Sequence, residues 1–298
     1  MLLSRRHPEG QPLAAVTPRR GAAPAPARAL PVRRRATSPR RRPGAPAIRL
    51  GRALLLAPLA VRLATLGCLI LLALVLLNVV YQVARKPTEL FGLVVAPAPL
   101  TPSEMWTRYG PQFRAHATDL VRAELLAALA HAESQGDPLA RTGWRWRWTW
   151  NPFALYAPAS SAVGLYQITD AAFEEGRQLC VHDHRVAHAG AWYDLDACWF
   201  PMLYMRTVPS HAIEMTSARL HEHLLQALGP ERAGRIGLRT RERVAAVIHL
   251  CGPSRAAAFV RRGFRTAPGE LCGAHDLGAY LARVDRATLT FERLARGA

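Results

Sequence analysis

A carboxylate at the end of an apolar helix is the first feature of the sequence that could do chemistry. Residues 118–133 (TDLVRAELLAALAHAE) place Leu and Ala at helical spacing, and Glu133 follows Leu129 by four residues on the same stripe. An apolar environment favours the protonated form of a carboxyl group, which can then donate its proton to a leaving oxygen in glycoside cleavage. On spacing alone, a helix-terminal Glu that turns into solvent or pairs with Arg141 is the simpler interpretation.

Two short motifs give this Glu a more specific context. Residues 130–138 read AHAESQGDP, and residues 162–169 read AVGLYQIT. Together they resemble the SLT-type lytic murein transglycosylases, in which a helix ends in Glu-Ser and a later Gly-Leu-x-Gln-Ile segment lines the same cleft. The resemblance covers about residues 103–265 and implies a mainly α, lysozyme-like fold of the goose-lysozyme and SLT type.

The resemblance also implies roles for individual residues. It makes Glu133 the catalytic acid/base, with supporting substrate-binding positions at Ser134, Gly164, Leu165 and Gln167. Such an enzyme cleaves the β-1,4 bond between MurNAc and GlcNAc with one carboxylate, because the C6 hydroxyl of the muramic acid closes a 1,6-anhydro ring; we expect no cofactor and no metal. A second carboxylate would indicate a lysozyme-type hydrolase instead. The candidates are Asp137, expected in a turn, and Asp170 and Glu174, expected near a helix N-terminus.

The family's third motif, Ala-Tyr-Asn before Gly-Pro, is altered in this sequence. Residues 248–253 read IHLCGP, so His249 stands at the Tyr position and Leu250 at the Asn position. His249 could hydrogen-bond Glu133 or substrate, or it could be a buried structural histidine. Leu250 cannot donate such a bond. This departure supports an alternative function, a catalytically weak peptidoglycan-binding scaffold of an envelope complex.

A Trp-rich stretch lies between the first two motifs. Residues 143–152 read GWRWRWTWNP; indole faces suit sugar rings, and Arg suits the carboxylates of peptidoglycan. We assign Trp144 and Trp146 to the cleft, with Tyr156 and Tyr166 as further substrate-binding candidates. Alternating Trp residues also fit core packing on one face of a hairpin.

The same Trp-rich stretch and residues 210–221 (SHAIEMTSARLH) are similar to transglycosylases of integrating conjugative elements. Those enzymes open the wall for a secretion channel. The similarity implies conjugation or type IV secretion components as partners, besides the peptidoglycan strands themselves.

The net charge of +18 is concentrated at the N-terminus. Residues 1–86 hold 16 basic residues and one acidic residue, whereas the rest holds 23 and 20. Residues 1–50, rich in Arg, Pro and Ala, predict a disordered cytoplasmic tail. Because the remaining chain is nearly balanced, nucleic acid is not an expected main partner.

Residues 63–81 carry no charge and have the length of a bilayer span, so we expect a transmembrane helix with basic flanks over 51–86. The excess of Arg before it predicts a single-pass inner-membrane protein with the N-terminus in the cytoplasm and the C-terminal domain in the periplasm. A true start nearer Arg49 would favour a cleaved signal peptide.

Cysteine usage agrees with an oxidising compartment. Four cysteines follow the predicted span, namely Cys180, Cys198, Cys251 and Cys272. An even number there suggests two disulfides, and among the three possible connectivities we favour the local pairs, the first with the second and the third with the fourth. His182, His184 and His188 raise zinc as an alternative, but the ligand spacings typical of zinc sites are missing.

The remaining periodicity is helical. We expect helices from near Thr169, over 210–228 and over 241–250, and no strand-rich stretch of comparable length. The predicted organisation after the span is a linker over 87–102 and a lysozyme-like domain over 103–298.

Overall fold

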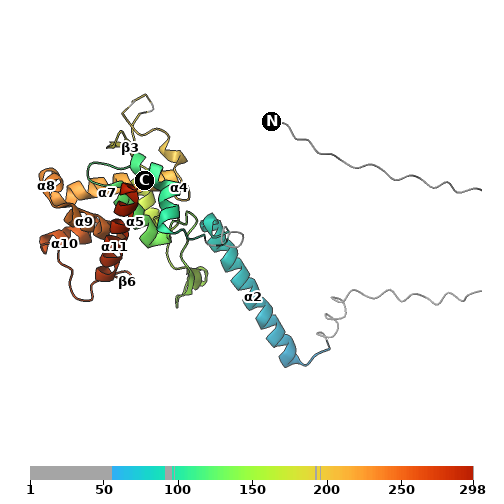
Figure 1. Ribbon diagram of the computed structural model, residues 1–298. Helices are drawn as coiled ribbons and strands as arrows, with labels where there is room; N and C mark the ends of the chain where they lie inside the picture. The colour runs from blue at the N-terminus through green and yellow to red at the C-terminus, as the bar shows by residue number, and fades with distance from the viewer. Residues whose placement is uncertain (1–55, 91–95, 97, 192, 195, 298) are drawn as a thin grey trace, which may run out of the picture. The chain divides into compact units, whose positions relative to one another are not determined.

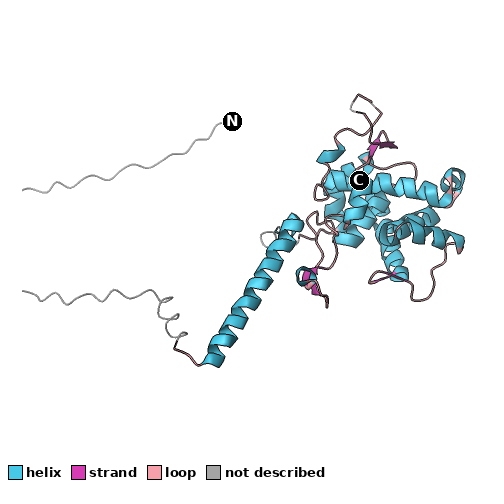
Figure 2. Ribbon diagram, turned by 180° about the vertical axis from the view of Figure 1, so that it is seen from behind, coloured by secondary structure: helices cyan, strands magenta, loops and turns pink. Residues whose placement is uncertain are grey.

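The computed structural model describes residues 56–90, 96, 98–191, 193–194 and 196–297. The predicted tail over 1–50 lies outside the described residues. In the described part of the chain helices dominate and the strands are short, as Figure 2 shows, which confirms the expected mainly helical class.

The first described helix, α2 (Leu59–Arg85), is longer than the uncharged stretch that predicted it. Its Leu and Val side chains are largely exposed, and its free cysteine, Cys68, is exposed as well. At about 1.5 Å per residue, its 27 residues exceed the ~30 Å of a bilayer core. By length and composition α2 is therefore a candidate membrane span.

Eight further helices in the described residues follow along the chain (Figure 1). They are α4 (Pro102–Ala115), α5 (Ala123–Ser134), α6 (Asp170–Gly176), α7 (Pro209–Leu228), α8 (Pro230–Arg235), α9 (Leu238–Cys251), α10 (Pro253–Arg261) and α11 (Leu277–Arg296). The short 3-10 turns are η1 (Pro87–Leu90), η2 (Pro152–Ala154) and η3 (Pro201–Leu203). The predictions for α6, α7 and α9 agree with these bounds to within three residues.

The strands form three two-stranded antiparallel hairpins. They pair β1 (Trp144–Trp146) with β2 (Tyr156–Pro158), β3 (Leu179–His182) with β4 (Arg185–His188), and β5 (Leu271–Cys272) with β6 (His275–Asp276). The second hairpin packs Leu179 and Val181 against Ala218 of α7.

Helix α5 forms the centre of the hydrophobic core. All residues from Leu125 to Ala130 are fully buried, and α4, α7 and α11 contact the helix. The helix begins at Ala123 rather than at Thr118, because the backbone N–H of Val121 donates to the hydroxyl and carbonyl oxygens of Thr118 in a turn. Since α11 belongs to this core, the core extends beyond the segment covered by the motifs.

An ion cluster fixes the start of α5 against two other helices. Arg122, just before α5, lies 2.7 Å from Glu292 of α11 and donates from Nε to Glu242 of α9 at 3.1 Å. Arg239 contacts Glu242 at 3.0 Å. These partly buried, shared contacts hold the three helices in register more firmly than isolated surface pairs would.

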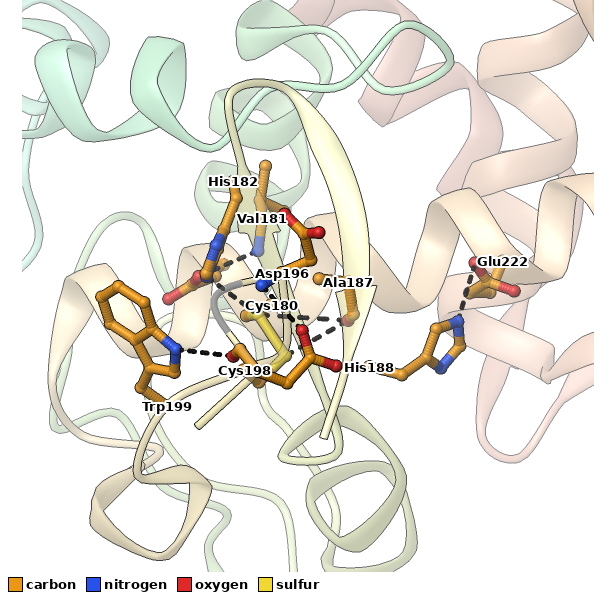
Figure 3. The surroundings of a disulfide bond; sticks show 11 residues. Cys180, Val181, His182, Ala187, His188, Asp196, Cys198, Trp199 and Glu222 are labelled. Atoms are coloured by element: carbon orange, nitrogen blue, oxygen red, sulfur yellow. Dashed lines mark hydrogen bonds and ion pairs between the residues drawn. A yellow bond between two sulfur atoms is a disulfide. The ribbon is translucent and has the colours of Figure 1, made fainter. Parts of the chain in front are cut away.

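Both local cysteine pairs lie at disulfide distance, which confirms the predicted connectivity. The Cα–Cα distances are 5.6 Å for Cys180–Cys198 and 5.3 Å for Cys251–Cys272. Figure 3 shows the first pair joining β3 to the loop that leads to Trp199, with His188 directed toward Glu222 of α7.

The second pair joins the C-terminal end of α9 to β5, a few residues before α11.

Candidate active site

A cavity of about 1010 Å³ opens beside the C-terminal end of α5. Its walls come from the end of α5, the segment before the first hairpin, and one face of α11. Six of the side chains that line it are charged or aromatic and lie around the end of α5, namely Glu133, Asp137, Arg141, Trp144, Arg283 and Arg286.

The chain places Glu133 at the cavity by ending α5 abruptly. Gln135 adopts a left-handed conformation with φ 53°, and Gly136 follows with φ 81°. The positive φ of Gly136 favours glycine at this turn, and a Cβ there would lie 2.9 Å from the sulfur of Met105, which would have to shift. The Glu133 side chain, which is 16% exposed, therefore stands in the partly exposed last turn of a helix whose middle is buried.

Two side chains from distant parts of the sequence meet Glu133. The hydroxyl of Tyr280, on α11, donates to Oε1 at 2.7 Å, and Nε2 of His249, on α9, lies 3.6 Å from the same oxygen. The second distance is too long for a hydrogen bond. Within the described part of the chain, both of these contacts are to Oε1, and no hydrogen bond to Oε2 is found.

Tyr280 is the site residue that the sequence analysis missed. The helical spacing of Leu277, Tyr280, Leu281 and Val284 is a signal from which α11, a helix that the sequence analysis did not predict, could have been found. Nothing in the sequence pairs this helix with Glu133, which lies 147 residues earlier.

Burial sets the protonation states around the carboxylate. It raises the pKa of Tyr280 well above the ordinary value, with the charge of Glu133 and the hydrogen bond to it adding to the effect. It lowers the pKa of His249, against the attraction of Glu133 and with the help of Arg219. Near neutral pH, Tyr280 therefore stays a donor and His249 stays uncharged.

The first two motifs are joined by direct hydrogen bonds. The hydroxyl of Ser134 donates to the carbonyl of Leu165 at 2.7 Å. The side-chain amide of Gln167 donates to the carbonyls of Ala140 and Gly164, each at 3.1 Å. Ser134 and Gln167 thus fix the second motif against the end of α5, whether or not they also contact substrate.

Gly164 makes a close backbone contact that no other residue could make. Its φ is +82°, and a Cβ there would lie 2.4 Å from the carbonyl oxygen of Arg206. Its N–H donates to the carbonyl of Ala140 at 2.7 Å. The role that the structure gives Gly164 is therefore conformational.

Leu165 and Tyr166 are fully buried, and the Tyr166 hydroxyl donates to the carbonyl of Leu126 at 3.1 Å. The ring of Tyr166 lies edge-on to His249, with centroids 6.1 Å apart. With Gln167, His249 and Leu250 it lines a smaller cavity of about 190 Å³. In this structure Leu165 supports the site by packing; substrate contact by these residues stays a prediction.

Three of the predicted aromatic residues cluster on the first hairpin, where the ring centroid of Tyr156 lies 5.2 Å from that of Trp144, but only Trp144 reaches the large cavity. Trp144 lines the large cavity, and its Nε1 donates to Glu89 at 2.9 Å. Trp146, which is exposed, packs on Tyr156 with centroids 4.8 Å apart, and neither lines that cavity. The alternation in the sequence therefore produced a hairpin, with Trp144 at the cavity.

The alternative carboxylates have other partners. Asp137 lines the cavity and accepts the N–H of Leu139 at 2.9 Å, in the expected turn. Asp170 and Glu174 lie on α6, as expected, and do not line the cavity. Their partners are Arg206 at 2.8 Å and Arg177 at 2.9 Å, respectively.

Three arginines face two carboxylates, those of Glu133 and Asp137, in the cavity wall. Arg141, Arg283 and Arg286 line the cavity, and the guanidinium of Arg283 lies 5.4 Å from the ring centroid of Tyr280. Such a wall suits a ligand that carries carboxylates.

A scan of the chain against protein-family models finds no match, and a search of curated proteins finds no relative.

Proposed function

We propose that this chain is a membrane-anchored lytic transglycosylase of lysozyme-like fold. It cleaves the β-1,4 bond between MurNAc and GlcNAc in peptidoglycan. The observation that carries the proposal is the setting of Glu133: one carboxylate oxygen accepts a hydrogen bond from Tyr280, and the side chain lines a large cavity.

The chemistry needs one proton carrier. Protonated Glu133 donates from Oε2 to the glycosidic oxygen as the bond to C1 of MurNAc breaks. The Glu133 carboxylate then takes the proton of the MurNAc C6 hydroxyl while the oxygen of that hydroxyl bonds to C1. This step forms the 1,6-anhydro ring without consuming water. The hydrogen bond from Tyr280 to Oε1 stabilises the carboxylate between the two steps.

The surrounding side chains suit this substrate. The lactyl and peptide carboxylates of peptidoglycan match the positive charges of Arg141, Arg283 and Arg286, and the half-buried indole of Trp144 offers a face for a sugar ring. Neutral His249 adds no second charge next to the carboxylate.

A lysozyme-type hydrolase is the second candidate, and the position of Asp137 favours it. Among the described acidic residues, Asp137 alone shares the large cavity with Glu133. Its hydrogen bond to the N–H of Leu139 suits a turn residue, which is why we prefer the mechanism with one carboxylate.

For the cellular setting we propose a single span by α2, with the cytoplasm before it and the periplasm after it. The two cysteine pairs fit an oxidising compartment. Conjugation or type IV secretion components remain the proposed partners, on the resemblance of the motifs alone.

The detergent-extracted full chain tests the enzyme proposal on purified peptidoglycan sacculi. Glu133→Gln keeps the shape but removes the titrating proton, and general acid–base catalysis contributes about 10²–10⁴-fold. Because Glu133 both gives and takes the proton, we expect a loss of muropeptide release at the top of that range. Glu124→Gln is the matched control, because Glu124 lies on the same helix and contacts Arg122 at 3.7 Å.

Activity that survives Glu133→Gln would contradict the proposal. Sacculi that stay intact after incubation with the unaltered chain would contradict the enzyme proposal and support the alternative function, a glycan-binding scaffold.

A further inference from the structure

The tip of the β1–β2 hairpin, residues 147–153, exposes more aromatic surface than a soluble loop normally does. Trp148 and Trp150 are both fully exposed, at 103% each. Trp is highly buried on average, so two such side chains in one short loop indicate a binding surface. Arg145 and Arg147 beside them are exposed as well.

The tip lies against the last turns of α2. The rings of Phe153, in the tip, and Tyr81, in α2, have centroids 4.8 Å apart. The side-chain amide of Gln82 donates to the carbonyl of Phe153. The hairpin therefore continues the surface of the candidate span at its C-terminal end.

A buried ion pair holds the base of the same hairpin. Glu89, only 3% exposed, lies 2.9 Å from Lys86 and accepts a hydrogen bond from Trp144. The ammonium of Lys86 also donates to the carbonyls of Ser160 and Ala162, each at 3.2 Å. A buried pair with added hydrogen bonds keeps its geometry, so the hairpin cannot swing freely away from the end of α2.

We propose that residues 147–153 insert into the lipid headgroup region of the outer leaflet of the bilayer that α2 crosses. The inference rests on the part of the proposed function that makes α2 a span. At about 1.5 Å per residue, α2 is longer than a ~30 Å hydrocarbon core, which leaves Tyr81 and Gln82 at the interface. Trp side chains prefer that interface, and Arg pairs with anionic lipid phosphates.

Glycan is the less suitable ligand for the tip. Neither Trp148 nor Trp150 lines the cavity that holds Glu133, whereas Trp144 at the hairpin base does. With the tip in lipid and the base in the cavity wall, the active site is held at a fixed height above the membrane. The enzyme would then act on the glycan strands nearest to the membrane.

A fluorescent label that responds to polarity, read in three positions of the full chain, tests the proposal. The native Cys68 reports the span. In a Cys68→Ser background, Thr149→Cys reports the tip and Glu231→Cys reports a helix α8 position, where the native side chain is 86% exposed. The vesicles contain phosphatidylethanolamine and phosphatidylglycerol, with a spin-label quencher placed either near the headgroup or near the chain end.

We expect the headgroup quencher to lower the fluorescence of the label at position 149 several-fold. The deeper quencher should lower that of the label at Cys68. Neither quencher should affect the label at position 231. Trp148→Ser with Trp150→Ser should abolish quenching at 149 and leave it unchanged at Cys68. A label at 149 that resembles the one at 231 overturns the lipid contact alone. So does a label at 149 that responds only to added muropeptides. An unquenched Cys68 overturns the span and this inference together, without touching the chemistry of Glu133.

Discussion

The helices around Glu133 and the stretch from Leu139 to Arg206 are stabilised in different ways. The helices bury long apolar stripes, and the ion cluster of Arg122 joins three of them. The stretch 139–206 has short strands and exposed aromatic side chains, and it is fixed at a few points such as Gly164 and the Cys180–Cys198 pair. Glu133, the proposed acid/base, thus lies on the densely packed part, while the proposed contacts with sugar and lipid come mainly from the sparsely packed part.

Substitutions in the two regions should have different consequences. Changes at the fixing points of 139–206 should mainly affect stability. Changes to the partners of Glu133 should mainly affect turnover.

Gly164→Ala should have the largest effect on stability. The added Cβ would lie 2.4 Å from a backbone oxygen that cannot move alone, in a conformation that Ala avoids. We expect a loss on the order of 3–5 kcal/mol. Gly143→Ala is the matched control, because nothing lies within 4 Å of its Cβ position. Thermal unfolding measures both, and equal melting temperatures would mean that the contact at Gly164 can relax.

Removal of the two disulfides should separate stability from activity. Each loss should destabilise the domain by roughly 2–4 kcal/mol. Replacing Cys251 and Cys272 with Ser should also lower turnover at temperatures where the chain stays folded, because that pair joins the helix of His249 to the segment before α11. Replacing Cys180 and Cys198 should leave turnover nearly unchanged. Equal losses of turnover would remove the distinction between the two regions.

Tyr280→Phe tests the densely packed part directly. A hydrogen bond to a charged group contributes about 1.5–3 kcal/mol, so kcat should fall roughly 10- to 100-fold with little change in KM. Tyr109→Phe, in a second buried tyrosine of the same core, should leave kcat unchanged. A rise in KM alone would make Tyr280 a substrate contact rather than a positioning residue.

The smallest effect concerns pH. Burial lowers the pKa of His249, opposed by Glu133, so the unfolded chain binds more protons than the folded chain below the ordinary value of about 6.5. The contribution of a neutral His249 is therefore complete above that pH and is lost as the pH falls from that value through the lowered pKa of the folded chain. His249→Gln should reduce the slope of the free energy of unfolding against pH by up to about 1.4 kcal/mol per pH unit in that window. Unfolding in urea at several pH values measures the slope, and an unchanged slope would exclude His249 as its source.

The sequence predicted the local features and missed the distant ones. The apolar side chains of α5, α7 and α9 recur every three or four residues, and this periodicity can be seen in the sequence. The span of α2 was predicted from a simpler feature, an apolar run without charge. The start of α5 was placed too early, because the turn at Thr118 competes with the helix. The pairing of Tyr280 with Glu133 arises from the packing of α11 on α5, which no local pattern encodes.

The hairpin of the Trp-rich stretch shows the same limit. Its alternation is compatible with a strand, but only the contacts of Glu89 and Phe153 separate Trp144, at the cavity, from Trp148 and Trp150 at the exposed tip.

The identity of the cleavage product, from sacculi digested in heavy-oxygen water, tests the central claim most directly. If Glu133 acts as the single catalytic carboxylate, the released muropeptides carry a 1,6-anhydro ring, have no reducing end and contain no oxygen from the solvent. Muropeptides that end in a reducing sugar with solvent oxygen at C1 would contradict this mechanism and make the protein a hydrolase.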